Sequence, residues 1–195
     1  MHQFILASQS PRRKALLEWA ELPFEIIVSE AEENYPSNLS MEEVPVFIAK
    51  NKATAVKAKI LEERGSVQHA CIIAADTVVV LDETILGKPI DKAAAMSSLQ
   101  KLAGRIHEVI TGVVVLYNEH EIAFSETTKV EFHPLTKEQI EFYVDKYQPY
   151  DKAGAYAIQE WIGVVGIKKI EGDFYNVMGL PVSKLMQKIK QLGID

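Results

Sequence analysis

A short apolar stretch near the beginning of the chain leads directly into hydroxyl groups and basic side chains. Residues 4–7 are apolar, Ser8 and Ser10 follow them, and Pro11 precedes the basic run 12–14. Ser10 is the predicted N-cap of a helix, because proline is tolerated in the first turn and the free N–H groups behind it carry the positive end of the helix dipole. Cations at this end oppose the dipole, so a bound anion is expected to compensate them. The planar guanidinium groups of adjacent arginines can each bind two phosphate oxygens, which suits a polyphosphate. The alternative interpretation is a basic helix start that is simply solvated.

A single carboxylate interrupts the most apolar stretch of the chain. Asp76 and Thr77 lie within residues 71–81, whose pattern is typical of a strand buried on both faces. A carboxylate at such a position is costly unless it is paired, protonated or bound to a metal. We therefore expect a functional carboxylate at a strand end. The alternative is an aspartate that faces solvent or accepts a hydrogen bond from a neighbouring backbone N–H.

Further charged side chains could complete a site for phosphate and a cation. The loop that contains Glu30, Glu32 and Glu33 could supply one or two carboxylates that join Asp76 around a hard cation such as Mg²⁺, although acidic loops are often simply solvated. Lys52 in a predicted helix and Lys88 in a predicted turn could each reach a phosphate oxygen as a point charge, or remain surface residues.

The segment 151–159 combines small residues with polar groups. Its alanines and Gly154 allow close approach of the backbone to a ligand, Lys152 adds positive charge, and Gln159 offers both a donor and an acceptor to the edge of a base. The alternative is a tightly packed turn and strand. The five histidines lack metal-ligand spacing, and no nucleophile elbow, P-loop or dinucleotide-binding glycine motif is present, which argues against the corresponding enzyme classes.

Composition sets further bounds on the class of protein. The chain has 195 residues, of which 48% are hydrophobic and 25% charged, and we expect one globular domain over residues 1–195. A net charge of -6 argues against general binding to nucleic acid or to an acidic membrane. Cys71 lies in an apolar run and is expected to be buried. The chain shows no leader pattern and no run near the ~20 apolar residues of a membrane span, so a cytoplasmic location is expected.

Strand and helix signals alternate along the chain, which favours an α/β architecture. A capping box is predicted at Ser40 and a helix cap at Thr136. The patterns predict strands at 4–8, 24–28, 71–81, 108–118, 121–132, 163–170 and 174–177, and helices at 11–20, 42–63, 91–102, 136–147 and 181–192.

Taken together, the motifs resemble those of the Maf family of nucleoside triphosphate pyrophosphatases. The matching segments are Ser8-x-Ser10-Pro11-Arg12-Arg13, Ala75-Asp76-Thr77, Gly87-Lys88-Pro89, Asp151-Lys152-Ala153-Gly154-Ala155-Tyr156-x-Ile158-Gln159 and the closing segment 171–181. The resemblance spans nearly the whole chain. It implies an α/β fold like that of inosine triphosphatases, with an elongated, mixed, twisted β-sheet flanked by helices, two lobes and a central cleft, and it implies a homodimer.

The resemblance also implies a reaction and a set of roles. The reaction is hydrolysis between the α- and β-phosphates of a nucleotide, with a divalent cation, Mg²⁺ or Mn²⁺. By motif, the nucleotide would be bound by Ser8, Arg12, Arg13, Lys52, Lys88 and Gln159. Asp76 would be the catalytic carboxylate, and Glu33 would join it as a metal ligand. The combination of Arg12, Thr77 and Gln159 resembles the branch that prefers dTTP and UTP, whereas Glu160-Trp161 replaces a glycine found in many relatives and implies a bulkier pocket rim.

The resemblance leads to a mechanistic hypothesis in which water attacks the α-phosphorus in line with departing pyrophosphate. Asp76 would either hold the cation or act as the base for that water. Two alternatives stay open: a non-catalytic nucleotide-binding regulator of cell division, and an enzyme that removes only the terminal phosphate.

Overall fold

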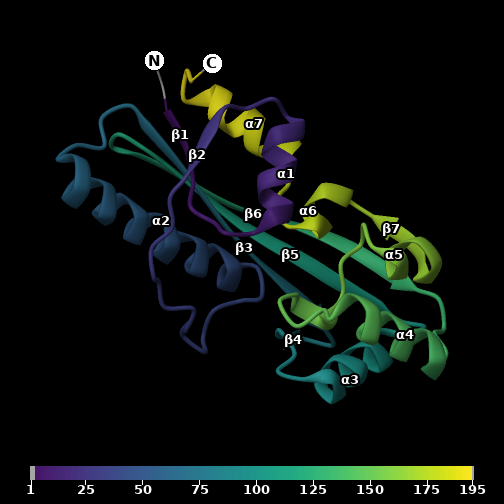
Figure 1. Ribbon diagram of the computed structural model, residues 1–195. Helices are drawn as coiled ribbons and strands as arrows, with labels where there is room; N and C mark the ends of the chain where they lie inside the picture. The colour runs from purple at the N-terminus through teal and green to yellow at the C-terminus, as the bar shows by residue number, and fades with distance from the viewer. Residues whose placement is uncertain (1–2, 195) are drawn as a thin grey trace. The chain divides into compact units, whose positions relative to one another are not determined.

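A computed structural model describes residues 3–194 of the protein (Figure 1). Its strands are β1 (Gln3–Leu6), β2 (Phe24–Ile26), β3 (Ala70–Leu81), β4 (Thr84–Leu86), β5 (Ile106–Tyr117), β6 (His120–Phe132) and β7 (Ile167–Glu171). Its helices are α1 (Pro11–Trp19), α2 (Glu43–Arg64), α3 (Lys92–Leu102), α4 (Lys137–Tyr147), the 3₁₀ turn η1 (Ala153–Ala155), α5 (Trp161–Gly166), α6 (Phe174–Met178) and α7 (Val182–Gln191). Among these residues, no helix is long and apolar enough to cross a membrane.

One seven-stranded sheet connects these elements. The strand order is β2-β1-β3-β5-β6-β7, and β4 pairs with β3 outside this path. Strand β1 is parallel to both β2 and β3, whereas β4 is antiparallel to β3 and β7 is antiparallel to β6. The sheet is therefore mixed, and with its flanking helices it confirms the expected α/β class.

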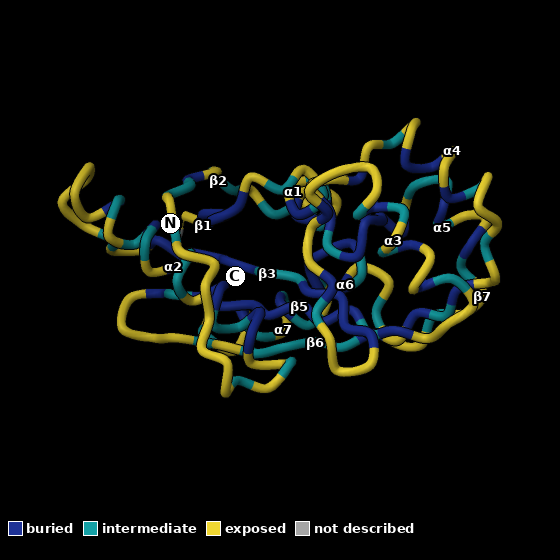
Figure 2. Tube along the Cα trace, turned by 90° about the horizontal axis from the view of Figure 1, so that it is seen from below, coloured by how far each residue is buried: buried dark blue, intermediate teal, exposed yellow. Residues whose placement is uncertain are grey.

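The chain divides into two compact units that share the long strands. The first unit comprises residues 3–76, 111–126 and 179–194, and the second comprises 77–110 and 127–178. Strand β3 passes from one unit to the other between Asp76 and Thr77, which are half-buried while the other residues of this strand are buried. Figure 2 shows that buried residues concentrate along the strands and exposed residues on the loops and outer helix faces.

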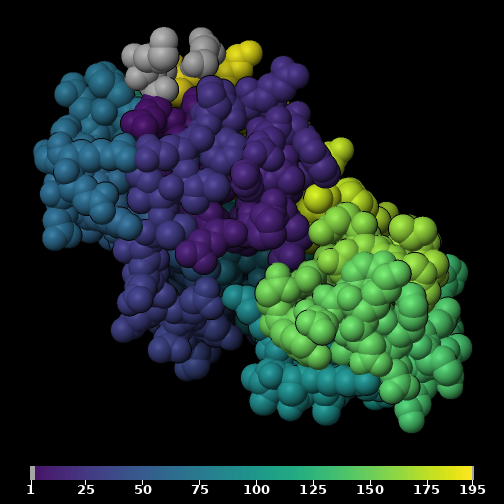
Figure 3. Space-filling model, viewed as in Figure 1, coloured from purple at the N-terminus to yellow at the C-terminus, as the bar shows by residue number. Residues whose placement is uncertain are grey.

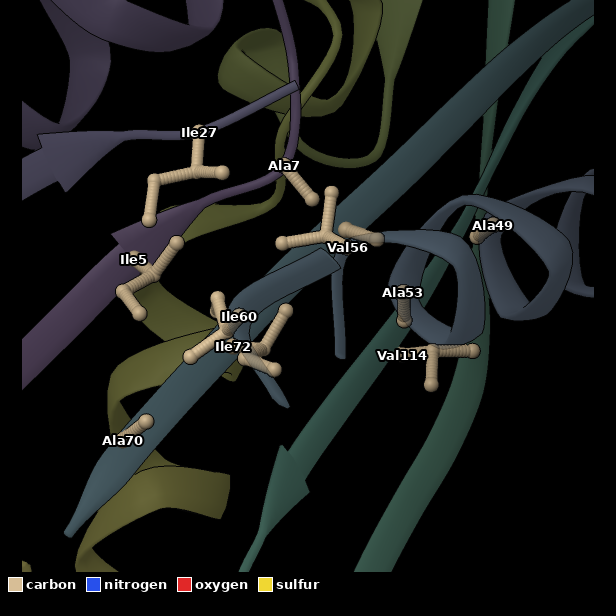
Figure 4. Close-up of a cluster of buried hydrophobic side chains, with 11 residues drawn as sticks. Ile5, Ala7, Ile27, Ala49, Ala53, Val56, Ile60, Ala70, Ile72 and Val114 are labelled. Atoms are coloured by element: carbon tan, nitrogen blue, oxygen red, sulfur yellow. The ribbon is translucent and has the colours of Figure 1, made fainter. Parts of the chain in front are cut away.

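The core of the first unit forms between α2 and one face of the sheet. In Figure 4, Ile60 of α2 lies beside Ile72 of β3, and Ala53 lies beside Val114 of β5. The cluster comprises Ile5, Ala7, Ile27, Ala49, Ala53, Val56, Ile60, Ala70, Ile72, Ala74 and Val114. Small residues on α2 let the helix approach the strands closely, and the apolar area removed from water stabilises the packing. Cys71, next to this cluster in β3, is fully buried as expected, and burial raises the pKa of its thiol to about 12.

Local capping groups determine where several helices begin. The Ser10 side chain accepts a hydrogen bond from the Arg13 N–H, as its N-cap position predicts. Thr136 and Gln139 form a reciprocal capping box at α4. Ser40 and Glu43 exchange the same pair of hydrogen bonds just before α2. The predicted caps at Ser10 and Thr136 are confirmed. The Ser40–Glu43 hydrogen bonds also form, but the N-cap residue of α2 is Glu42, whose side chain makes no cap hydrogen bond.

Of the two predicted strands near the C-terminal end, one is partly wrong and the other is wrong. Residues 163–166 belong to helix α5, and only 167–170 of that prediction are a strand. Gly163 lies against the backbone of Ile158, where a Cβ atom would come within 1.7 Å of the carbonyl oxygen, so a tight turn overrides the strand preference of the neighbouring valines. Residues 174–177 form helix α6, because the Asp173 side chain accepts the Tyr175 N–H at 2.7 Å and caps its start. Strand β4 and the turn η1 were not predicted.

Candidate active site

The loop between β1 and α1 positions the first group of candidate residues. Ser8 lies two residues after the buried end of β1, and its Oγ accepts a hydrogen bond from the Ser10 N–H at 3.2 Å. Ser10 then caps α1, so the free N–H groups of the first helical turn point toward this loop. The start of the helix carries no acidic residue and instead carries Arg12 and Arg13. This arrangement is suited to an anion.

Arg13 is buried at the start of α1. Its Nε donates to the carbonyl oxygen of Gly179 at 2.8 Å, and its Nη1 donates to Ser8 Oγ at 3.2 Å. Burial lowers the pKa of this guanidinium, while the negative charges of Asp76 and Glu33 act in the opposite direction. Arg12, which is half-buried, adds a like charge that lowers the Arg13 pKa further. Arg13 is therefore a fixed cation that connects the helix start to the segment before α7.

Lys52 joins two carboxylates in the same unit. Its Nζ lies 2.7 Å from Asp76 Oδ1 and 2.8 Å from Glu33 Oε1. The side chains of Lys52 and Asp76 are 19% and 15% exposed, whereas that of Glu33 is 54% exposed. Asp76 is thus neither turned fully to solvent nor isolated in the core, and its ion pair offsets much of the cost of burial. We refer to Ser8, Arg13, Glu33, Lys52 and Asp76 as the charged cluster.

The charged cluster offers oxygen ligands of the type that Mg²⁺ prefers. Among residues 3–194, no three histidine, cysteine, aspartate or glutamate side chains gather into a ready-made metal cage. Mg²⁺ is commonly held by one or two carboxylates together with substrate phosphates and water. Asp76 and Glu33, which both contact Lys52 Nζ, fit that kind of site.

Three further predicted site residues belong to the second unit. Thr77 follows Asp76 in β3, Lys88 lies in the exposed turn after β4, and Gln159 is exposed at the end of the motif 151–159. The Gly154 N–H donates to the Gly87 carbonyl at 3.3 Å, which connects the turn of Lys88 to that motif. The structure therefore brings together five predicted residues in the first unit and two predicted segments in the second.

Backbone geometry in the motif 151–159 explains its small residues. Gly154 has φ of 65°, and a Cβ atom there would lie 2.9 Å from the Val79 side chain. Tyr156 is buried, and its hydroxyl lies 2.7 Å from Nε2 of the buried His107. Burial lowers the pKa of His107 to about 4 and raises that of Tyr156, so both side chains are neutral near pH 7.

Sequence reasoning missed several residues that support these groups. Tyr143 and His107 were not singled out, and the carbonyl of Gly179 could not be paired with Arg13 because 166 residues separate them. Of these supporting residues, only Glu160 could have been noticed in the sequence, because it stands where many relatives have a glycine. These contacts are tertiary, and no local pattern specifies them.

The fold and the charged cluster define a class of protein: an α/β protein with a helix N-terminus, arginine and lysine side chains and paired carboxylates suited to a phosphorylated ligand. The family model for Maf-like protein matches residues 3–192. The chain therefore belongs to the Maf-like protein family, and the resemblance seen in the sequence is confirmed.

Curated relatives carry a specific name. A protein of Cytophaga hutchinsonii named dTTP/UTP pyrophosphatase is 50% identical over 96% of this chain and 83% of its own length. Proteins of the same name from Porphyromonas gingivalis strain W83 and Bacillus anthracis are 45% and 46% identical, over 98% and 100% of this chain and 95% and 98% of their own lengths. Among solved structures, the Staphylococcus aureus Ham1 protein aligns over 67% of this chain and 71% of that one, with 14% identity and a TM-score of 0.44.

Proposed function

We propose that this protein is a hydrolase that converts dTTP and UTP to the nucleoside monophosphate and pyrophosphate. The observation that carries the proposal is the charged cluster, in which Lys52 contacts both Asp76 and Glu33 and the buried Arg13 lies within the field of both carboxylates. A non-reactive binding surface has little reason to keep so many charges partly desolvated. The names of relatives at 42–50% identity support the same reaction.

The proposed reaction is attack of water on the α-phosphorus. The oxygen of water forms a bond to phosphorus while the bond from phosphorus to the α,β-bridging oxygen breaks, and pyrophosphate leaves with the electron pair. Asp76 accepts the proton of the attacking water. Its Oδ1 already accepts a hydrogen bond from Lys52, and we assign the proton transfer to Oδ2.

The cationic groups act on the charge that grows on the leaving pyrophosphate. Arg12, Arg13 and the N-terminal end of α1 are assigned to phosphate oxygens, with Ser8 as a hydrogen-bond donor. Arg13 keeps its orientation through Gly179 and Ser8, so little reorganisation is needed when charge develops. Lys52 and Lys88 are assigned to further phosphate oxygens.

A divalent cation, Mg²⁺ or Mn²⁺, completes the proposal. Asp76 and Glu33 would hold it. When bound, such a cation supplies Lewis-acid stabilisation of phosphate charge. Lys52, which contacts both carboxylates, would offset part of the negative charge that they keep.

Pyrimidine preference is assigned to Arg12, Thr77 and Gln159 by resemblance to the dTTP/UTP branch. The Gln159 amide can donate to O4 and accept from N3–H of uracil or thymine. The same resemblance supports a homodimer, a cytoplasmic location and the treatment of residues 1–195 as one Maf-like domain.

The experiment measures pyrophosphate and orthophosphate release from dTTP, UTP, CTP, GTP and 7-methyl-GTP in the presence of Mg²⁺. We expect pyrophosphate from dTTP and UTP, and a loss of about 10²–10⁴-fold in kcat for Asp76→Asn, the range for a lost general base. Asp82→Asn is the matched control, since Asp82 is exposed and pairs with Arg105. Orthophosphate as the first product would indicate removal of the terminal phosphate, and nucleotide binding without turnover would favour a regulator.

A further inference from the structure

A tyrosine in α4 holds the residue that follows Gln159. The buried hydroxyl of Tyr143 donates to Glu160 Oε2 and accepts the Ala157 N–H at 3.2 Å. The same hydroxyl therefore contacts the residue before and the residue after the pair 158–159. Neither Tyr143 nor Glu160 belongs to the charged cluster.

Two more contacts keep Glu160 in place. Lys152 Nζ lies 3.6 Å from Glu160 Oε1, and the Lys152 side chain is only 10% exposed. The Glu160 carbonyl accepts the N–H of Gly163 at 2.9 Å, which starts helix α5. We call residues 152–163 the anchored segment, because its two ends and Glu160 near its middle are tied by these contacts.

Packing against α4 adds to the hydrogen bonds. The ring of Trp161 lies 4.8 Å from that of Phe142 in an edge-to-face arrangement. Figure 3 shows α4 and the anchored segment as one continuous green surface of the second unit. Gln159 is exposed within this otherwise fixed backbone, so the site of base contact that we assign to it has a rigid support.

We propose that Tyr143 and Glu160 are positioning residues that fix Gln159 for the selection of uracil and thymine over cytosine. This inference rests on the proposed function and names the groups that set its base specificity. Uracil presents O4 as an acceptor and N3–H as a donor, whereas cytosine presents an amine and an acceptor at the same positions. A glutamine amide satisfies one pattern only after a half-turn relative to the other. The contacts of Tyr143 with the residues that flank Ile158 and Gln159 set where this amide meets the base edge.

The test compares kcat/KM for UTP and CTP in three variants. Tyr143→Phe removes the hydroxyl, and Glu160→Met removes its acceptor at similar size. We expect each to lower the UTP/CTP ratio about tenfold, as expected when one buried hydrogen bond is lost. Glu160→Gln keeps an acceptor for Tyr143 and should retain the ratio within about threefold. Glu141→Gln, on the exposed face of α4 beside Lys92, is the matched control.

A purely structural role predicts a different outcome. It would lower kcat/KM equally for both nucleotides, and an unchanged ratio in Tyr143→Phe or Glu160→Met would overturn the inference. If the UTP/CTP ratio of Glu160→Gln were as low as that of Glu160→Met, the hydrogen bond from Tyr143 would not be the cause of the selectivity. If Tyr143→Phe does not fold, Glu160→Met decides, because the Glu160 side chain is partly exposed.

A second readout separates this inference from the proposed function. Thermal stabilisation by UMP and by CMP measures base selection without turnover. Wild-type protein that binds UMP selectively but releases no pyrophosphate would refute the proposed function, while the same variants would still test the positioning role. Wild-type protein that releases pyrophosphate from UTP but shows no preference between UMP and CMP would refute the positioning role and leave the proposed function standing.

Discussion

The charged cluster and the anchored segment hold their residues in different ways. In the charged cluster, ionised side chains contact one another, as Lys52 does with Asp76 and Glu33. In the anchored segment, the neutral Tyr143 hydroxyl, backbone groups and aromatic packing fix the chain around Gln159, together with one ion pair between Lys152 and Glu160. The buried Tyr156 within the segment and its partner His107 are both neutral near pH 7.

This difference separates chemistry from recognition. Partly buried charges strengthen electrostatic interactions with a polyphosphate, but each of them costs desolvation free energy. A base edge carries no charge, and its recognition depends on the position of donors and acceptors. Substitutions in the charged cluster should therefore change turnover, whereas substitutions around the anchored segment should change stability or selectivity.

Apart from Asp76→Asn, the largest expected effect is on turnover and comes from Lys52→Met. Removing Nζ takes away the cation shared by Asp76 and Glu33 and a proposed phosphate contact, so we expect kcat to fall by about 10²–10³-fold. Pyrophosphate release from UTP measures the effect, after unfolding curves have established that the variant is folded.

Lys50→Met is the matched control for this prediction. Lys50 lies two residues earlier in α2 and pairs with Glu121 on the exposed surface, where such pairs contribute about 0–1 kcal/mol to stability. Near-normal turnover in Lys52→Met would contradict the contrast between the charged cluster and the anchored segment. The charges of the cluster would then contribute to stability and not to catalysis.

A smaller effect is expected from Gly163→Ala, and it should appear in stability. Alanine favours helices over glycine, yet a Cβ atom at this position would lie 1.7 Å from the Ile158 carbonyl oxygen. We expect the free energy of unfolding in urea to fall by about 2–3 kcal/mol, as for overpacked sites.

Gly87→Ala tests whether the loss comes from the close contact. No atom lies within 4 Å of a Cβ at Gly87, so its stability should change by no more than about 0.5 kcal/mol. An equally stable Gly163→Ala would show that the anchored segment is not rigid, and the contrast with the charged cluster would lose its basis.

Much of the first unit could be predicted because local patterns specify it. Ser10 and Pro11 define the start of α1, and the carboxylate within an apolar strand marks Asp76. The contact between Asp76 and Lys52 could not be predicted, since the two residues are 24 positions apart and nothing between them signals the pairing. The residues with a chemical role could therefore be predicted from the sequence, whereas the residues that they contact could not.

The second unit was harder to predict for a related reason. Valines at 164 and 165 favour a strand by intrinsic preference, but contact of Gly163 with Ile158 makes this stretch helical. The contact of Tyr143 with Glu160 depends on the docking of α4, which no local motif encodes. Tertiary packing decided both features.

The smallest expected effect concerns pH and the neutral groups near the anchored segment. Burial lowers the pKa of His107 to about 4, compared with 6.5 for an ordinary histidine. Between these values the unfolded chain binds more protons than the folded protein, so stability is lost as the pH falls from 6.5 toward 4. We expect the contribution of this one group to the free energy of unfolding to fall by about 2 kcal/mol between pH 7 and pH 5.

Urea unfolding of wild type and His107→Gln at the two pH values isolates this term. Glutamine can still form a hydrogen bond with the Tyr156 hydroxyl but does not titrate, so its loss of stability in acid should be smaller by about the same 2 kcal/mol. Equal losses in both proteins would mean that His107 takes up its proton without disturbing the fold. Neutrality of the buried groups would then not distinguish the second unit, and the contrast with the charged cluster would rest on Tyr143 and Glu160 alone.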